Sequence, residues 1–224
     1  MRPLTDDIPK PMVALAGRPL VDHVLDRLAT AGIARAIVNV HYKPAPLLAH
    51  LEARIGTPRI EISDETKLLL DTGGGVTRVL GDIGRDPFLI HNSDTVWLET
   101  GVANLDRLID AWNPARMDSL LLLADRAASI GYDGRGDFHL AADASLQRRG
   151  KAETSPYVFA GVSIADPAMF ADAPTGPYSL NLPWDQAIAR KRLFGVVMDG
   201  LWMHVGTPQA LIEAEQRIAN AARR

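Results

Sequence analysis

The sequence predicts an α/β fold, with a mostly parallel sheet and helices on both faces. Short apolar runs rich in β-branched residues alternate with stretches of helical periodicity, which is the pattern of strands joined by helices. The chain has 224 residues, 47% of them hydrophobic, enough for one medium-sized domain with a full core. Neither an internal repeat nor a low-complexity linker interrupts it, so we expect one domain over residues 1–224.

The first quarter of the chain predicts an irregular start followed by alternating helices and strands. Residues 1–18 are rich in proline. A helix is expected over 19–31, because Pro19 suits a first turn, apolar residues recur at helical spacing and Gly32 follows as a stop. The next expected elements are a buried β-branched strand over 36–40, a helix over 46–54 and a strand over 59–62.

In the middle of the chain, three glycines and several apolar runs predict a loop, two helices and two strands. Gly73-Gly74-Gly75 precedes an apolar-periodic stretch, so we expect a loop that leads into a helix. Residues 87–92 read as a strand that ends at Ser93-Asp94. A helix over 102–112 and an apolar strand over 119–124 follow.

The last part begins with an irregular insertion after about residue 130. The expected elements are a turn into a strand over 134–140, a strand over 157–164, a helix over 183–191 and a strand over 193–198. A long helix is expected over 207–222, with Thr207 as its N-cap and Pro208 at the first helical position.

Composition and charge exclude several classes of function. The net charge is −3, which argues against a nucleic-acid-binding protein held by a basic surface. The chain has no cysteine, so disulfides, thiolate catalysis and thiolate metal sites are excluded. No apolar run approaches the roughly 20 residues of a membrane span, and the N-terminus lacks a signal-peptide core. We therefore expect a cytoplasmic protein that binds neither nucleic acid nor membrane.

Three segments could carry chemistry. Arg2 and Lys10 lie in a proline-stiffened segment that could hold a polyphosphate, although two solvated charges would look the same. The glycine triplet could let backbone N–H groups approach a ligand, or could be a flexible turn. Asp94, at the end of an apolar strand, could hold Mg²⁺ or could cap the next turn.

Taken together, these segments resemble the nucleotidyltransferases that make nucleoside-diphosphate sugars. The resemblance covers essentially the whole chain. It rests on Met1-Arg2-Pro3-Leu4-Thr5, Pro9-Lys10-Pro11-Met12, Ala16-Gly17-Arg18-Pro19-Leu20, Asp71-Thr72-Gly73-Gly74-Gly75, Asn92-Ser93-Asp94, Phe159-Ala160-Gly161-Val162 and Trp202-Met203-His204-Val205-Gly206-Thr207-Pro208.

The resemblance implies a fold, a reaction and a set of site residues. The fold would be the Rossmann-like nucleotide-diphospho-sugar transferase fold with a mixed sheet, residues 1–125 binding the nucleotide and 126–224 forming the sugar-binding part and the C-terminal helix. A nucleoside triphosphate and a sugar 1-phosphate would react to give a nucleotide sugar and pyrophosphate. The implied residues are Arg2 and Lys10 for catalysis, Gly17, Thr72, Gly73, Gly74 and Asn92 for the nucleotide, Asp137 and Gly161 for the sugar, and Asp94 and His204 for Mg²⁺.

The chain departs from the family pattern in two places. The family's first strand and the Gly-x-Gly-x-Arg part of its loop are not in the sequence, so we expect unpaired ladder groups and a gap in the core. We expect a start codon that lies upstream, and the alternative is a natural fragment with reduced activity. His204 stands where the family usually has a second metal-binding Asp. A neutral imidazole is a poor Mg²⁺ ligand. The alternatives are a one-carboxylate site, a substitute such as Asp199, or Mn²⁺.

The substrates are suggested by one further segment. Gly134-Arg135-Gly136-Asp137-Phe138 resembles a segment of the N-acetylmuramate-1-phosphate uridylyltransferases, so UTP and N-acetylmuramic acid 1-phosphate are expected. A mannose-1-phosphate guanylyltransferase using GTP is the alternative, because base choice depends on a few hydrogen bonds in the pocket. A catalytically silent homologue or subunit that binds a nucleotide sugar is the alternative from another class.

Overall fold

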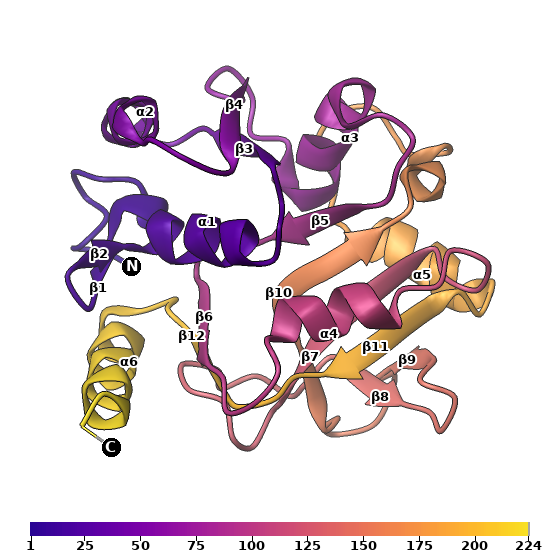
Figure 1. The fold of residues 1–224 in the computed structure, drawn as a ribbon. Coiled ribbons are helices and arrows are strands. Elements are labelled where there is room, and N and C mark those ends of the chain that lie inside the picture. Colours follow the sequence, from indigo (N-terminus) through magenta and orange to yellow (C-terminus); the bar gives the residue numbers. More distant parts are fainter. Residues whose placement is uncertain (224) are drawn as a thin grey trace.

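Strand β7 (Ser119–Asp125) lies inside the main sheet of the protein, whose computed structural model describes residues 1–223 (Figure 1). On one side β7 pairs in parallel with β11 (Leu193–Val197), and on the other it pairs antiparallel with β10 (Tyr157–Ala165). The far edge of β10 pairs with β5 (Phe88–His91) and, at Tyr157, with the hairpin of β8 (Phe138–Leu140) and β9 (Leu146–Arg148). The sheet is therefore mixed.

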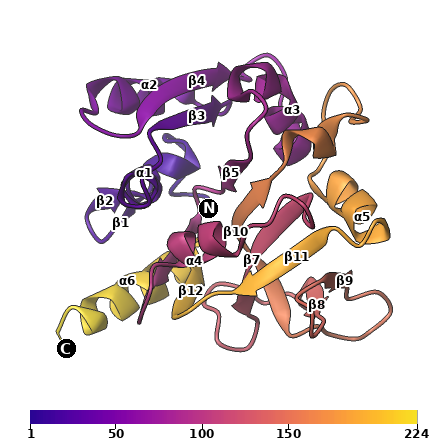
Figure 2. The ribbon, with the colours of Figure 1, turned by 45° about the vertical axis from the view of Figure 1, so that its right-hand side comes forward.

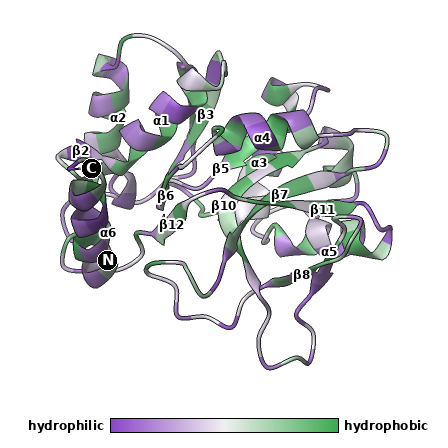
Figure 3. Cartoon of the chain, turned by 60° about the horizontal axis from the view of Figure 1, so that its bottom comes forward, coloured by the Kyte–Doolittle hydropathy of each residue, from purple (hydrophilic) through white to green (hydrophobic). Residues whose placement is uncertain are grey.

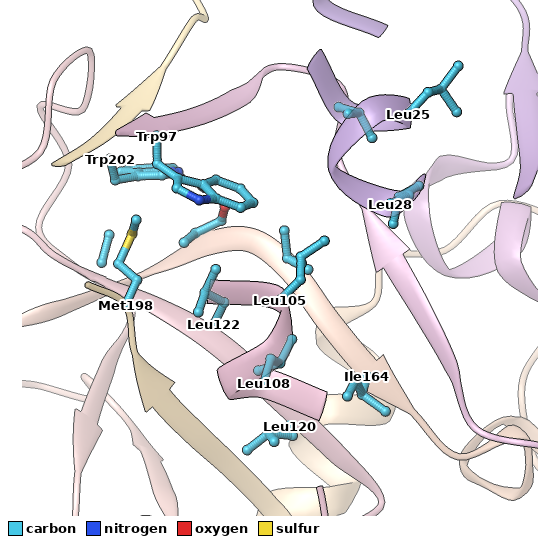
Figure 4. Packing of buried hydrophobic residues seen from close by; sticks show 14 of the residues in the cluster. Leu25, Leu28, Trp97, Leu105, Leu108, Leu120, Leu122, Ile164, Met198 and Trp202 are labelled. Carbon is cyan, nitrogen blue, oxygen red and sulfur yellow. Dashed lines mark hydrogen bonds between the residues drawn. The ribbon is translucent and has the colours of Figure 1, made fainter. Parts of the chain in front are cut away.

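Helices cover both faces of β7, whose side chains are buried on both sides. Leu120 and Leu122 face a core that contains α4 (Asn104–Ala111), as Figure 4 shows. Leu121 and Leu123 face the opposite core, with Trp184 of α5 (Asn181–Ala189). Strands buried on both faces read as continuous apolar runs, which is why this one is Leu-rich. The predicted α/β class, with a mixed sheet and helices, is confirmed. The expectation that the sheet is mostly parallel is wrong, since β7 and β11 are the one parallel pair among the described strands of the main sheet.

A separate two-stranded parallel sheet lies apart from the main one in Figures 1 and 2. It contains β3 (Arg35–Val40) and β4 (Arg59–Asp64), and it is accompanied by α1 (Leu20–Thr30) and α2 (Pro44–Ala53). The prediction that β3 is a buried strand is wrong, since only Val40 is buried. Within residues 1–223, β3 pairs with β4 alone and β5 with β10 alone, so each leaves one edge without a ladder.

In a third part of the fold, elements near the N-terminus pack against elements near the C-terminus. The antiparallel pair β6 (Thr95–Leu98) and β12 (Leu201–His204) packs with the short hairpin of β1 (Ala14–Leu15) and β2 (Arg18–Pro19), and with α6 (Pro208–Ala221). Helix α6 is mostly hydrophilic with hydrophobic patches (Figure 3), and its buried residues are Ala210 and Ala214. Thr207 accepts a hydrogen bond from Ala210 N at 3.1 Å, as expected of the N-cap.

Several short elements were not predicted. These are β1, β2, β6, β9 and β12, together with the 3-10 turns over Lys10–Met12 and Pro167–Phe170. Each is two to four residues long, too short for periodicity to distinguish it from a loop. Among residues 1–223, none of the helices has the length and apolar character needed to cross a bilayer.

The glycine triplet does not form the predicted loop. Gly73, Gly74 and Gly75 are buried in the first turns of α3 (Asp71–Ile83). The N–H groups of Gly73 and Gly74 donate to the carbonyl oxygen of Tyr178 at 2.8 and 3.1 Å. A Cβ at Gly74 would overlap the carbonyl oxygen of Gly176. The glycines are therefore required because the segment around Tyr178 packs directly on the helix backbone.

This packing predicts opposite effects for two glycines of α3. Gly74→Ala should lower the free energy of unfolding by about 1–3 kcal/mol, because the new methyl group collides with backbone. Gly81→Ala should raise it by up to about 1 kcal/mol, because Gly81 has no heavy atom within 4 Å of its would-be Cβ and alanine is the better helix former. Urea unfolding of both variants checks this; equal effects would contradict the packing account.

Partly buried His91, at the end of β5, gives the fold a pH dependence. Its ring stacks on Trp97 at 5.6 Å, and its Nε2 has no hydrogen-bond partner among the described residues. Burial lowers the pKa of His91 from 6.5 to about 4, and the nearby charge of Arg27 acts in the same direction. The hydrogen bond to the Asn92 carbonyl and the charge of Asp94 raise the pKa but do not compensate.

Stability should therefore fall as the pH is lowered from 6.5 to 4. In this window the unfolded chain binds a proton at His91 that the folded chain does not, at a cost of up to about 3 kcal/mol. His91→Phe, which keeps a flat ring against Trp97, should remove that part of the pH dependence. Urea unfolding at pH 7, 5.5 and 4 measures it, and an unchanged pH slope in the variant would refute the assignment.

Candidate active site

Three side chains from distant parts of the chain meet at one carboxylate. Lys10 Nζ donates to Asp94 Oδ2, and His204 Nε2 lies 3.2 Å from the same oxygen. The three side chains are between 21 and 35% exposed, so the group is partly buried but open to solvent. The sequence prediction named all three residues, and the structure brings them together.

Local structure fixes the position of each member. Lys10 begins a 3-10 turn between Pro9 and Pro11, which restrict the backbone around it. Asp94 directly precedes β6, and its carbonyl oxygen accepts a hydrogen bond from Val205 N at 2.8 Å. His204 is the last residue of β12 and pairs in register with Thr95. The β6–β12 pair therefore places His204 beside Asp94.

The carboxylate of Asp94 is held in its charged form. Burial raises its pKa, but the hydrogen bond from His204 and the charge and hydrogen bond of Lys10 outweigh burial and leave the pKa well below its ordinary value. The site therefore offers an anionic oxygen and a lysine ammonium at one place. Such a combination can hold a divalent cation and a phosphate group side by side.

His204 is oriented by two further contacts. Its ring stacks on Trp202 at 5.8 Å with an interplanar angle of 8°, and its Nδ1 lies 3.3 Å from the carbonyl oxygen of Gly131. Asp199, the proposed substitute carboxylate, instead accepts a hydrogen bond from Thr100 at 2.8 Å. The structure gives no contact between Asp199 and Asp94 among the described residues.

The donor set of this group offers a metal ion one protein carboxylate. In the described part of the chain, no three His, Cys, Asp or Glu side chains gather as a metal-binding group. Asp94 alone supplies a carboxylate, and Mg²⁺ commonly binds one or two carboxylates together with substrate phosphates and water. The residues therefore fit the one-carboxylate alternative.

Two predicted site residues lie outside this group. Arg2 is 82% exposed and pairs with Asp6 at 3.5 Å. Gly17, with a φ of +77°, forms the turn of the β1–β2 hairpin with open space around it. The nucleotide role of Gly17 and the catalytic role of Arg2 stay predictions.

Asn92 and Gly161 are joined across the sheet close to Asp94. Asn92 N donates to the carbonyl oxygen of Gly161 at 2.8 Å. Gly161 has a φ of +83° and lies where the register of β10 shifts, and a Cβ there would come within 2.8 Å of Thr95. Thr95 in turn donates to the Ala160 carbonyl oxygen at 2.6 Å. The bulge thus anchors the strand that follows Asp94.

The remaining predicted residues make contacts within the protein. Thr72 Oγ1 accepts a hydrogen bond from Leu180 N at 3.0 Å, next to the Tyr178 contacts of Gly73 and Gly74. Asp137 Oδ2 accepts a hydrogen bond from Phe159 N at 2.9 Å. Their roles in binding nucleotide or sugar stay predictions.

An aromatic wall extends from His204, and the sequence analysis did not assign it to the site. Tyr132 lies against Trp202 at 6.1 Å, and Trp202 stacks on His204. Tyr132 OH accepts a hydrogen bond from Gly136 N at 3.0 Å. The wall therefore runs from Asp94 toward the segment around Asp137. In the sequence, the one pattern that indicates this wall is the spacing of Trp202 and His204, which places both side chains on the same side of β12.

The sequence and fold of this chain are similar to those of known proteins. N-acetylmuramate alpha-1-phosphate uridylyltransferase of Caulobacter vibrioides is 45% identical over 99% of this chain and 93% of its own length. The protein of the same name from Neisseria meningitidis serogroup B is 31% identical over 96% and 91%. The crystal structure of HddC from Yersinia pseudotuberculosis complexed with GMP-PN shares the fold, with a TM-score of 0.76 and 19% identity over 97% of this chain and 93% of that one.

The family model described as the MobA-like NTP transferase domain matches residues 4–154. This range contains Lys10 and Asp94, which supply the ammonium and the carboxylate of the site. With about two thirds of its length matched and a relative 45% identical over nearly its whole length, the chain belongs to the MobA-like NTP transferase family.

Proposed function

We propose that this chain transfers UMP from UTP to N-acetylmuramic acid 1-phosphate, giving UDP-N-acetylmuramic acid and pyrophosphate. We further propose that it does so in the cytoplasm, in the recycling of cell-wall sugars. The observation that carries the proposal is the meeting of Lys10, Asp94 and His204 at one partly buried point. The two uridylyltransferases that match over more than nine tenths of both chains support the choice of substrates.

The chemistry needs positioning and charge neutralisation. A phosphate oxygen of the sugar 1-phosphate attacks the α-phosphorus of UTP, and the bond from that phosphorus to the bridging oxygen breaks to release pyrophosphate. Negative charge increases on the phosphate oxygens as this happens, so a fixed cation stabilises the transition state. Lys10 supplies that cation, and the two prolines beside it limit its movement.

Asp94 and His204 contribute to catalysis through metal binding and through the positioning of the carboxylate. Asp94 would hold Mg²⁺, or Mn²⁺, which would supply positive charge to the phosphates of the substrate. His204 contacts the same carboxylate oxygen from the side of the aromatic wall and so limits the positions that the carboxylate can take.

Removing the ammonium of Lys10 tests the catalytic assignment. Lys10→Met should lower kcat by about 10²–10³-fold, because a transition-state cation is lost. Lys191→Met, at an exposed lysine after α5, is the matched control and should keep full activity. Pyrophosphate release at saturating substrate measures both. A Lys10→Met enzyme within threefold of the unaltered chain would reject the role.

A substrate panel tests the choice of nucleotide and sugar. UTP and GTP are each combined with N-acetylmuramic acid 1-phosphate and mannose 1-phosphate in the presence of Mg²⁺, and pyrophosphate is measured. We expect the UTP and N-acetylmuramic acid 1-phosphate pair to react at least about tenfold faster than the others, a discrimination that pocket hydrogen bonds can supply. Preference for GTP with mannose 1-phosphate would instead make the chain a guanylyltransferase. Nucleotide binding by calorimetry without turnover would make it a silent homologue.

A further inference from the structure

Two arginines without acidic partners lie at the far end of the aromatic wall. Arg126 and Arg149 are both partly buried, and neither forms an ion pair among residues 1–223. Arg126 Nε donates to the Ser155 carbonyl oxygen at 3.2 Å, and one terminal nitrogen of Arg149 donates to the Ala152 carbonyl oxygen at 2.6 Å. These contacts use only part of each guanidinium, which has five N–H donors.

Backbone hydrogen bonds hold the segments that carry these arginines together. Arg126 N donates to the Pro156 carbonyl oxygen at 2.9 Å, and Arg149 N donates to that of Asp137 at 3.0 Å. Asp137 N in turn donates to the Tyr157 carbonyl oxygen at 2.7 Å. These backbone hydrogen bonds therefore fix the positions of both arginines around the start of β10.

Both arginines act on Tyr132, the outer residue of the aromatic wall. Burial and the charge of Asp137 raise the pKa of Tyr132, while the hydrogen bond from Gly136 and the charges of Arg126 and Arg149 lower it. One oxygen of Asp137 accepts a hydrogen bond from Phe159 N. On balance the pKa of Tyr132 is raised, and the two arginine charges reach its hydroxyl at the opposite end of the wall from Asp94.

A buried hydroxyl group lies beside these backbone hydrogen bonds. Ser155 is 2% exposed, and its Oγ has no hydrogen-bond partner among the described residues. It packs on Gly136, whose φ of +81° and lack of a side chain permit the approach. A buried hydroxyl without a partner costs free energy, so a polar partner supplied by a ligand would stabilise it.

We infer that Arg126 and Arg149, next to Tyr132, bind a carboxylate on the sugar of the substrate and so select acidic sugar 1-phosphates. The inference rests on the proposed function, in which the phosphate lies at Lys10 and Asp94 and the sugar extends along the wall. N-acetylmuramic acid carries a lactyl ether with a carboxylate, which N-acetylglucosamine lacks. Guanidinium groups bind carboxylates through charge-assisted, often bidentate, hydrogen bonds.

The test compares two sugars that differ in the lactyl group alone. With UTP, kcat/KM is measured for N-acetylmuramic acid 1-phosphate and for N-acetylglucosamine 1-phosphate. Arg126→Gln and Arg149→Gln should each lower the ratio of the two values by about ten- to a hundredfold, mainly through KM for the acidic sugar. The KM for UTP should not change, and Arg126→Lys should retain part of the preference because the charge remains.

Arg135→Gln is the matched control. Arg135 accepts a backbone hydrogen bond from Ser155 N, and its exposed side chain forms no hydrogen bond or ion pair among the described residues. It should leave the ratio unchanged. A loss of activity that is equal for both sugars in the Arg126 and Arg149 variants would show a structural role and overturn the inference.

Calorimetry separates failure of this inference from failure of the proposed function. If the unaltered chain turns over neither sugar, binding of the two sugar 1-phosphates still decides the inference. Tighter binding of the acidic sugar that disappears in Arg126→Gln would support carboxylate recognition even in a protein without turnover. Equal binding of both sugars by the unaltered chain would overturn it.

Discussion

The carboxylate of Asp94 is the point on which the site depends. It joins the N-terminal turn, through Lys10, to the end of β12, through His204. The charge is stable in a partly buried place because two donors surround it, and those donors are 84 and 110 residues away in sequence. The fold satisfies this requirement with one antiparallel pair, β6 and β12, which carries the carboxylate at one end and the imidazole beside it.

The strongest parts of the sequence prediction concern long elements with a clear pattern. The Leu-rich strand β7, the helix α1 and the capped helix α6 follow from apolar periodicity and from a Thr-Pro start. Lys10, Asp94 and His204 were identified by resemblance to a family, whereas their contacts depend on β6 and β12. Those strands have four residues each and pair across more than a hundred positions, so local patterns do not reveal them.

The glycine triplet shows why a correct motif can be given the wrong local structure. Consecutive glycines usually indicate a loop, because glycine weakens helices. Here the cost is accepted within α3 because Tyr178 and Gly176 pack on the helix backbone, which no side chain would allow. The reason lies a hundred residues further along the chain, and a reading of residues 71–75 alone could not supply it.

The separation of the β3–β4 pair from the main sheet has a consequence for cooperativity. No ladder hydrogen bond joins the two sheets within residues 1–223, so α1, whose Leu25 and Leu28 pack into the shared core, connects them through side chains. Contacts of this kind are not directional, whereas a hydrogen-bonded ladder fixes the register of the strands that it joins. An opening of the layer of β3, β4 and α2 would therefore break no ladder of the main sheet, and its cost is the exposure of packed side chains such as Val40, Leu47 and Leu51.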